Sequence, residues 1–207
     1  MRLETENVSG YTLPKILPWE KEDAHNMSAN LTKQHIWESF YELSGKMPFD
    51  KITVERIIAR SGVSKATFYR HFRDKYDVLN YNSLAIAERL IGFKECKSWK
   101  DFLLLMFQEI EREIVYYRRA FKTSGQNAHS QFLYKYSFGI VRECYLTTYH
   151  REELSTREYY MIAHYCHGCV DALEEWLKEP EGMSAEQMAE LFYSVMPECL
   201  RDTWLTK

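Results

Sequence analysis

The stretch TVERIIARSGVSKATFYRHFRDKYDVL, residues 53–79, predicts two short helices joined by a tight turn. Thr53 and Ser64 are residue types whose side-chain oxygens cap helix N-termini, and each precedes a segment with helical spacing of apolar residues. Gly62 lies between the two segments and suits a turn. Two short helices joined in this way form a helix-turn-helix, whose second helix enters the major groove of DNA.

The second of these helices has an apolar side and a polar side. At the spacing of an α-helix, Val63, Phe68 and Phe72 point toward the first helix. Tyr69 stays free to contact a phosphate. Residues that are small or able to form hydrogen bonds occupy the other side, where base edges would be within reach: Lys65, Ala66, Thr67 and Arg70.

Positive charge is concentrated in this region. The net charge of the chain is −3, but residues 56–75 contain six basic side chains against the single acid Asp74, which leaves the remainder at about −8. A basic patch on an acidic body favours docking to DNA, because the patch releases counterions. The alternative is a basic helix that simply faces solvent.

The whole chain has the composition of a globular, all-α protein. Its 207 residues are 45% hydrophobic and 28% charged, with only five prolines and eight glycines, and apolar residues recur every three or four positions. The apolar run 102–107 is far shorter than a membrane span, and no signal segment opens the chain, so we expect a cytoplasmic protein without membrane contact. The five cysteines are expected to be free thiols.

Three regions follow from these patterns. Residues 1–28 contain Pro14 and Pro18 and are expected to form an irregular, flexible arm. Residues 29–84 form the helix-turn-helix domain, with a first helix over 29–43. The remaining residues, 85–207, form a helical regulatory and dimerisation domain.

Residues 53–79 resemble the DNA-binding domain of the TetR/AcrR regulators, in which a Ser-capped recognition helix is followed by Tyr-x-x-Phe and a lysine that opens the fourth helix. The resemblance extends over about 31–84, and HYCHGCVDALEEWLKEPEGMSAEQMAELFYSVMP, residues 164–197, looks like the final helices of a TetR subgroup. Three positions depart from the family pattern: Glu55, Ile58 and Ser61. The acid at Glu55 puts the exact phosphate contacts in doubt.

The resemblance implies a set of DNA contacts. Thr53 and Lys75 would hold phosphates at the two edges of the unit, and Tyr69 and His71 would do so from the recognition helix. Ser64 would cap that helix and reach a phosphate as well. Four residues would contact bases or lie beside them: Lys65 donates to guanine, Ala66 meets a thymine methyl, Thr67 serves either base, and Arg70 completes the set. Packing on the fourth helix is the alternative for Tyr69 and His71.

The second domain is rich in aromatic residues, and TetR-like proteins hold a small-molecule pocket among such helices. Core packing is the alternative reading of aromatics at helical spacing. The candidate ligand contacts are Phe102, Phe107, Tyr117, Phe121, Tyr134 and Phe138.

The segment HYCHGC, residues 164–169, contains residue types that bind zinc. It lies inside a helix opened by the capping box from Ser155 to Glu158, where neighbouring side chains point to different sides. Small residues at a close helix contact explain it more simply, so we predict neither a metal nor a cofactor.

The dimer is expected at the two C-terminal helices. The helix around 159–170 is apolar almost all round, so it must cover two surfaces, and the last helix starts at a capping box from Ser184 and extends to Pro197. The predicted interface residues are Cys166, Gly168, Cys169, Leu173, Phe192 and Val195.

Together these features predict a homodimeric, ligand-responsive repressor that binds a pseudo-palindromic double-stranded DNA operator. Two alternatives stay open: a TetR-like activator, and a protein-interaction module that has kept the helix-turn-helix shape without binding an operator. An enzyme is not expected, and no catalytic residue is assigned, because the sequence lacks a Gly-rich phosphate loop, a Gly-x-Ser-x-Gly motif and a His-Glu-x-x-His motif.

Overall fold

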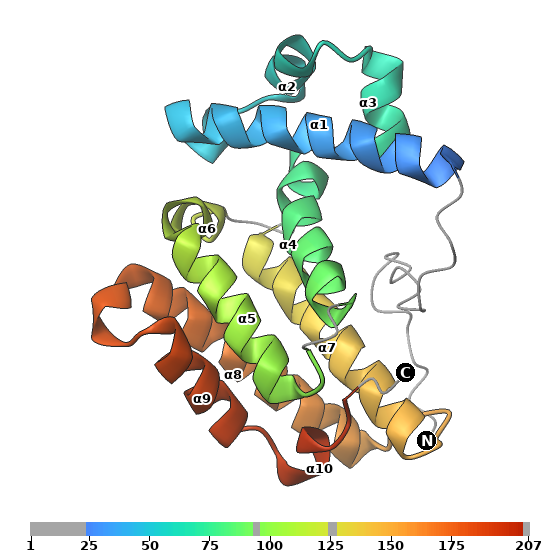
Figure 1. Cartoon of the computed structure of the whole chain (residues 1–207), viewed down its shortest axis with the longest axis vertical. Coiled ribbons are helices and arrows are strands. Elements are labelled where there is room, and N and C mark those ends of the chain that lie inside the picture. The colour runs from blue at the N-terminus through green and yellow to red at the C-terminus, as the bar shows by residue number, and fades with distance from the viewer. Residues whose placement is uncertain (1–23, 93–95, 124–127, 205–207) are drawn as a thin grey trace.

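A computed structural model describes residues 24–92, 96–123 and 128–204, and every regular element in these ranges is helical (Figure 1). The N-terminal domain contains α1 (Ala24–Lys46), the short 3₁₀ helix η1 (Phe49–Lys51), α2 (Val54–Ser61), α3 (Lys65–His71) and the first part of α4 (Lys75–Gly92). The second domain contains α5 (Trp99–Arg112), α6 (Ile114–Ala120), α7 (His129–Thr148), α8 (Thr156–Lys178), η2 (Pro180–Gly182), α9 (Ala185–Ser194) and α10 (Glu198–Arg201). The all-α fold class is confirmed.

The predicted helix-turn-helix is confirmed in its capping geometry. Thr53 precedes α2 in extended conformation and accepts a hydrogen bond from the backbone N–H of Arg56, and Ser64 does the same for Thr67 at the start of α3. Gly62 ends α2 with φ of 70°, in the left-handed region that a residue with a Cβ rarely adopts. These local preferences hold α2 and α3 at their crossing angle.

The core of this domain is apolar and continuous with α1. Ile36 and Phe40 of α1, Ile57 of α2 and Phe68 of α3 are all essentially inaccessible to solvent. The helix α1 begins at Ala24 instead of Ala29, so the last residues of the predicted arm are helical. The rest of that arm, residues 1–23, lies outside the described residues.

The helix α4 belongs to both domains. It starts at Lys75, next to the recognition helix, and continues to Gly92 against α5 and α7 (Figure 1). The boundary predicted between residues 84 and 85 therefore falls inside one rigid helix. The described part of the helix ends at Gly92, and residues 93–95 lie outside the described residues.

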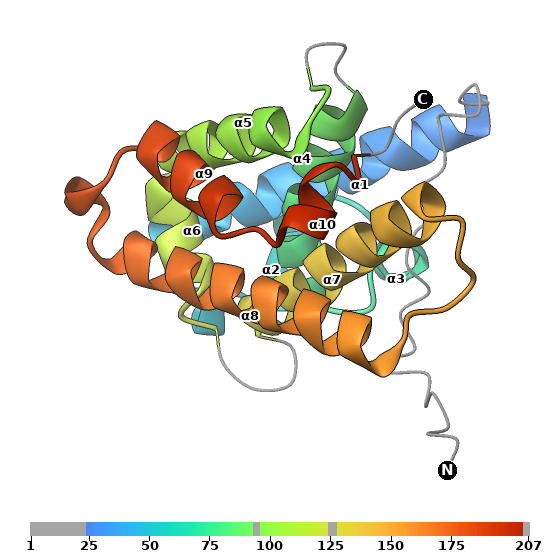
Figure 2. The same ribbon diagram turned by 90° about the horizontal axis from the view of Figure 1, so that it is seen from below.

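The second domain is built from two pairs of helices that pack along each other, α5 with α9 and α7 with α8. Aromatic rings fill the seam between α5 and the C-terminal elements, with 4.7 Å between the ring centroids of Phe107 and Phe192 and 5.0 Å between those of Trp99 and Trp204. Figure 1 shows α8, α9 and α10 at the end of the molecule away from α2 and α3, and in Figure 2, seen from below, they lie in front of those helices.

Both predicted capping boxes are present, at Ser155 with Glu158 and at Ser184 with Gln187. The last predicted helix is divided: α9 ends at Ser194, and Pro197 precedes the separate short helix α10. None of the helices in the described ranges combines the length and the apolar character needed to cross a membrane.

Candidate functional site

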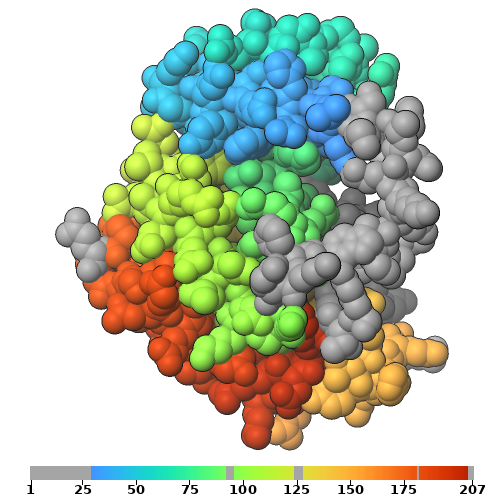
Figure 3. All heavy atoms as spheres, viewed as in Figure 1, coloured from blue at the N-terminus to red at the C-terminus, as the bar shows by residue number. Residues whose placement is uncertain are grey.

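The recognition helix α3 lies at one end of the molecule. In Figure 3 the cyan atoms of α2 and α3 form that end, with α1 beneath them. Lys65, Ala66, Tyr69 and Arg70 are exposed, whereas Phe68 is completely buried. The side of α3 that the sequence assigned to DNA therefore faces outward, and the ring of Tyr69, which packs edge-on against Phe68, is 49% exposed.

Two of the predicted DNA contacts also act as caps. Ser64 Oγ accepts from the backbone N–H of Thr67 at 3.0 Å and lies 2.9 Å from Thr67 Oγ1, so the two hydroxyls orient each other. Thr53 Oγ1 accepts from the N–H of Arg56 at 3.3 Å. A hydroxyl that accepts in this way still has its own proton to donate, and Thr53 directs that proton toward the carboxylate of Glu55, so a phosphate at the edge of the unit would compete with Glu55 for it.

Lys75 is placed differently from the sequence-based expectation. Its Nζ lies 2.9 Å from the carbonyl oxygens of Phe49 and Ile52 and 3.2 Å from that of Asp50. An ammonium group has three protons, so these three carbonyls occupy all of them. In this geometry Lys75 fastens the start of α4 to η1, and a phosphate would have to displace one of these carbonyls.

The basic patch is less basic than its composition indicated. Arg60 of α2 forms an ion pair with Glu42 of α1, and Arg73 forms a bidentate pair with Asp77, with both distances at 2.8 Å. The sequence count missed Glu42 because it lies outside residues 56–75 and is brought to Arg60 only by the packing of α1 on α2.

Two further titratable residues on this face, His71 and Glu55, have lowered pKa values for different reasons. Partial burial, followed by the charges of Lys33 and Arg70, lowers the pKa of His71, so its imidazole is neutral at physiological pH. Hydrogen bonds from its own backbone N–H and from Thr53 lower the pKa of Glu55, as does the charge of Lys65 to a smaller extent. The acid noted in the sequence at Glu55 therefore stays ionised beside Lys65.

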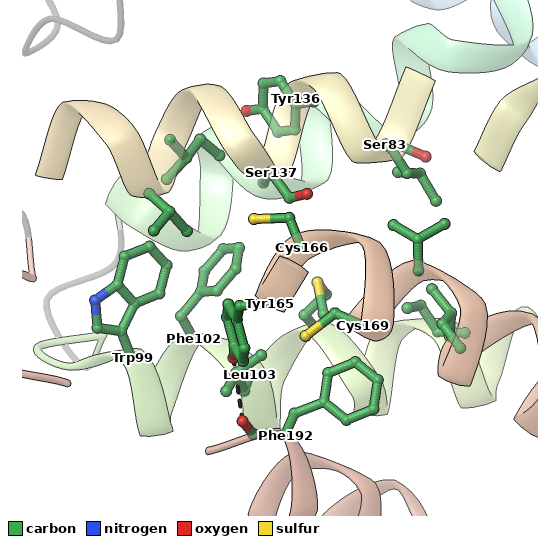
Figure 4. Close-up of a pocket in the computed structure, with 18 of the residues that line it drawn as sticks. Ser83, Trp99, Phe102, Leu103, Tyr136, Ser137, Tyr165, Cys166, Cys169 and Phe192 are labelled. Carbon is green, nitrogen blue, oxygen red and sulfur yellow. Dashed lines mark hydrogen bonds between the residues drawn. The ribbon is translucent and has the colours of Figure 1, made fainter. Parts of the chain in front are cut away.

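A cavity of about 130 Å³ lies in the second domain, lined by residues of α4, α5, α6, α7, α8 and α9 (Figure 4). Two of the six predicted ligand contacts line it, namely Phe102 and Tyr117. The sequence analysis missed most of the remaining wall, although α5 carries a recognisable stripe at helical spacing: Trp99, Phe102, Leu103, Met106 and Ile110.

The other four predicted ligand contacts do not line this cavity, and each packs against another ring. Phe107 packs against Phe192 and Trp176 behind the cavity wall, and Phe121 packs against His129. Tyr134 stacks on His167 with 3.6 Å between ring centroids, and Phe138 packs on Tyr159. The alternative reading of these aromatics as packing residues holds for all four.

The residues of the predicted dimer interface are divided between the inside and the outside of the protomer. Cys166, Cys169, Leu173 and Phe192 line the cavity of their own protomer, so they face inward in this structure. Gly168 and Val195 do lie on the outside, and Val195 is 59% exposed. Apolar residues on all sides of α8 left open which stripe turns inward, and the positions of α5 and α7 decide it.

The segment 164–169 is divided between the two sides of α8. His164 and His167 are exposed, whereas Cys166 is buried. Within the described residues, no three His, Cys, Asp or Glu side chains gather as a metal site requires. Burial raises the pKa of the Cys166 thiol to about 12 and that of Cys169 to about 11, so both are protonated at neutral pH.

Two family models match the chain over these same elements. Residues 41–81, which include α2 and α3, match the model of bacterial regulatory proteins of the tetR family. Residues 97–198, which include most of the cavity wall, match the model of a transcriptional regulator C-terminal region. No curated protein matches the sequence.

Solved structures share the fold at low sequence identity. The activator DhaS of the dihydroxyacetone kinase operon aligns with a TM-score of 0.57 and 16% identity, over 81% of this chain and 94% of that one. A TetR transcriptional regulator from Streptococcus agalactiae aligns with a TM-score of 0.55 and 17% identity, over 84% of this chain and 98% of that one. Both alignments extend over the two domains.

Proposed function

Since this chain belongs to the TetR family of DNA-binding transcription regulators, we propose that it is a homodimeric repressor that releases its operator when a small molecule fills the cavity. One observation carries the proposal. Ser83, Ile86 and Ala87 of α4 form part of the cavity wall, and the same helix starts at Lys75, directly after the recognition helix. A ligand that binds more tightly to one orientation of α4 than to another would therefore change the distance between the two recognition helices of the dimer.

The proposed DNA contacts keep the sequence-based assignment with one change. Lys65, Ala66, Thr67 and Arg70 would meet base edges or lie beside them, and Thr53, Ser64, Tyr69 and His71 would contact phosphates. His71 would donate as a neutral imidazole, because its pKa is lowered. We assign Lys75 to positioning, because all its protons are used within the protein.

The proposed dimer uses the exposed side of α8. Tyr160, His164, Gly168 and Asp171 all lie on that side. When two copies of α8 cross antiparallel at Gly168, His164 comes opposite the partner's Asp171, and the two-fold axis repeats the pair. The exposed apolar side chains of Leu191 and Val195 on α9 would extend the contact.

Activation of transcription is a second candidate for the regulatory effect of this protein. The structurally similar DhaS is described as an operon activator, which favours activation by the present chain as the alternative to repression. In either case the protein would act on chromosomal DNA in the cytoplasm.

Fluorescence anisotropy with DNA from upstream of the protein's own gene tests the proposal. We expect saturable binding that prefers this DNA to a shuffled duplex and weakens steeply with salt, together with a footprint of two half-sites about 34 Å apart. A promoter fusion with and without the protein then separates repression from activation. Equal affinity for both duplexes would instead favour a protein-interaction module.

A further inference from the structure

The side chains around the cavity define the chemistry of its occupant. We propose that the cavity binds a neutral, largely apolar molecule of about one ring in size, with a single hydrogen-bonding group that pairs with the hydroxyl of Tyr136. The inference about the ligand is independent of the proposed function, except that the link between ligand binding and DNA release rests on that function.

The absence of charge in the wall excludes ions. Among the described residues, every side chain that lines the cavity is aliphatic, aromatic, a thiol, a thioether or an aliphatic hydroxyl, and none is acidic or basic. An ionised ligand would lose its hydration there without gaining a counter-charge, which costs several kcal/mol or more. The wall therefore selects neutral molecules.

Three polar groups of the wall have hydrogen-bond partners within the protein. The hydroxyl of Tyr165 donates to the carbonyl oxygen of Phe192 at 3.1 Å (Figure 4). The hydroxyl of Ser137 donates to the backbone carbonyl oxygen of Tyr134, also at 3.1 Å. The indole N–H of Trp99 donates to Thr203 Oγ1 at 3.3 Å. These groups hold the wall in place and have no donor left for a ligand.

Two wall hydroxyls, those of Tyr136 and Ser83, differ from these groups because they have no hydrogen-bond partner in the described part of the chain, and Tyr136 is the more deeply buried residue of the two. Tyr136 is only 7% exposed. A buried hydroxyl without a partner costs about 1–3 kcal/mol, and such groups in native proteins call for an explanation. A ligand that forms one hydrogen bond with the hydroxyl of Tyr136 would supply that explanation.

The volume limits the size of the ligand. A cavity of roughly 150 Å³ lined by Leu, Ile and Phe binds benzene in another protein, and the cavity here is about 130 Å³. A single substituted ring fits this space. Sulfur atoms of Cys166, Cys169, Met106 and Met196 add polarisable contacts that favour an aromatic ring.

The thiols of Cys166 and Cys169 do not form covalent bonds with the ligand. Because burial holds Cys166 and Cys169 in the protonated form, they are slow nucleophiles, and binding is reversible. They are nevertheless reporters placed inside the cavity. Cys199 is partly exposed and does not line the cavity, so it serves as an internal reference.

The test compares four probes of similar size: 4-methylphenol, toluene, benzoate and benzylamine. Their dissociation constants are measured by ligand-observed NMR on the full chain, and cysteine alkylation by iodoacetamide is followed by peptide mass spectrometry. We expect 4-methylphenol to bind at least about tenfold more tightly than the two ions and to slow alkylation of Cys166 and Cys169 but not of Cys199. Binding of either ion as tight as that of 4-methylphenol would overturn the ligand class.

Two kinds of variant locate the contacts. Tyr136→Phe should reduce the preference for 4-methylphenol over toluene by about fivefold, the equivalent of one hydrogen bond, without lowering the melting temperature of the free protein. An unchanged preference would overturn the role of Tyr136. Cys166→Phe or, from the α4 wall, Ala87→Leu should abolish protection of Cys169, whereas Arg157→Phe on the exposed side of α8 should preserve it.

DNA affinity measured in the same samples separates this inference from the proposed function. Binding of 4-methylphenol with no effect on DNA affinity would support the ligand class and contradict ligand-controlled release. Release of DNA by benzoate or benzylamine, with protection of the same two cysteines, would contradict the ligand class and support ligand-controlled release.

Discussion

The ammonium of Lys75 donates a hydrogen bond to the carbonyl oxygen of Phe49 across 2.9 Å, which joins the start of α4 to the turn that follows α1. Two further carbonyls, of Asp50 and Ile52, complete the arrangement. The helix that forms part of the cavity wall is thus fastened to the DNA-binding domain at its first residue. Any displacement of α4 would act on this contact.

Replacing Lys75 with Met should destabilise the protein by about 1–3 kcal/mol, because three carbonyl groups lose their donor while the apolar stem is kept. Urea denaturation measures the loss. The matched control is Lys65→Met on the exposed face of α3, which should leave stability unchanged and weaken DNA binding. If Lys75→Met left stability intact and lowered the salt slope of DNA binding by about one, Lys75 would be a phosphate contact after all.

Base and phosphate contacts on α3 should respond differently to substitution. Thr67→Ala should relax preference at particular base pairs, because it removes a hydroxyl oriented by Ser64. Tyr69→Phe should weaken binding about equally on all sequences, because it removes only a phosphate contact. Anisotropy titrations on a set of operator point variants give both results, and equal small effects from the two changes on every duplex would exclude the groove assignment.

An acidic side chain in place of His164 tests the proposed pairing across the dimer. His164→Glu places an acid opposite the partner's Asp171 twice, so the dimer dissociation constant should rise about tenfold. Sedimentation equilibrium measures this change. Adding Asp171→Lys to the same chain should restore association, and a double variant weaker than the single one would rule out this register.

Gly168→Arg should also weaken the dimer and DNA binding together. A Cβ at Gly168 meets nothing within 4 Å in the protomer, so the arginine does not disturb the fold of one chain. Far-ultraviolet circular dichroism should therefore stay nearly unchanged while the sedimentation coefficient falls. An arginine variant that still dimerises would place the interface elsewhere.

Stability should decrease in mild acid because of His129. Burial lowers the pKa of this residue to about 3, and its Nδ1 lies 2.8 Å from Asn80 Oδ1 on α4. The ordinary pKa is about 6.5, so below that pH the unfolded chain binds a proton that the folded chain does not. The free energy of unfolding should fall by roughly 2 kcal/mol between pH 7.5 and pH 5 from this group alone.

Urea denaturation at several pH values measures this dependence. The slope should be much smaller in His129→Gln. It should be kept in the control His150→Asn, where an exposed residue with φ of 50° is replaced by one that tolerates this conformation. Identical slopes for His129→Gln and the unmodified protein would show that His129 does not titrate as its burial indicates.

Local sequence is enough to specify the features of this protein that depend on neighbours within one helical turn. The caps at Thr53, Ser64, Ser155 and Ser184 need only the backbone N–H three residues later, and Gly62 needs only its own backbone freedom. The exposed face of α3 followed from the same local spacing. These short-range requirements were sufficient to predict the helix-turn-helix and the side of α3 that is exposed.

The contacts between distant segments depend on tertiary packing and could not be read from local sequence. It brings Glu42 to Arg60 and the carbonyls of η1 to Lys75, and it turns Cys166 toward the cavity and Gly168 toward solvent. A helix that is apolar on all sides carries no signal of which stripe is covered, because burial depends on where its neighbours pack. The cavity and the outer side of α8 therefore became distinguishable only once α5, α7 and α9 were in place.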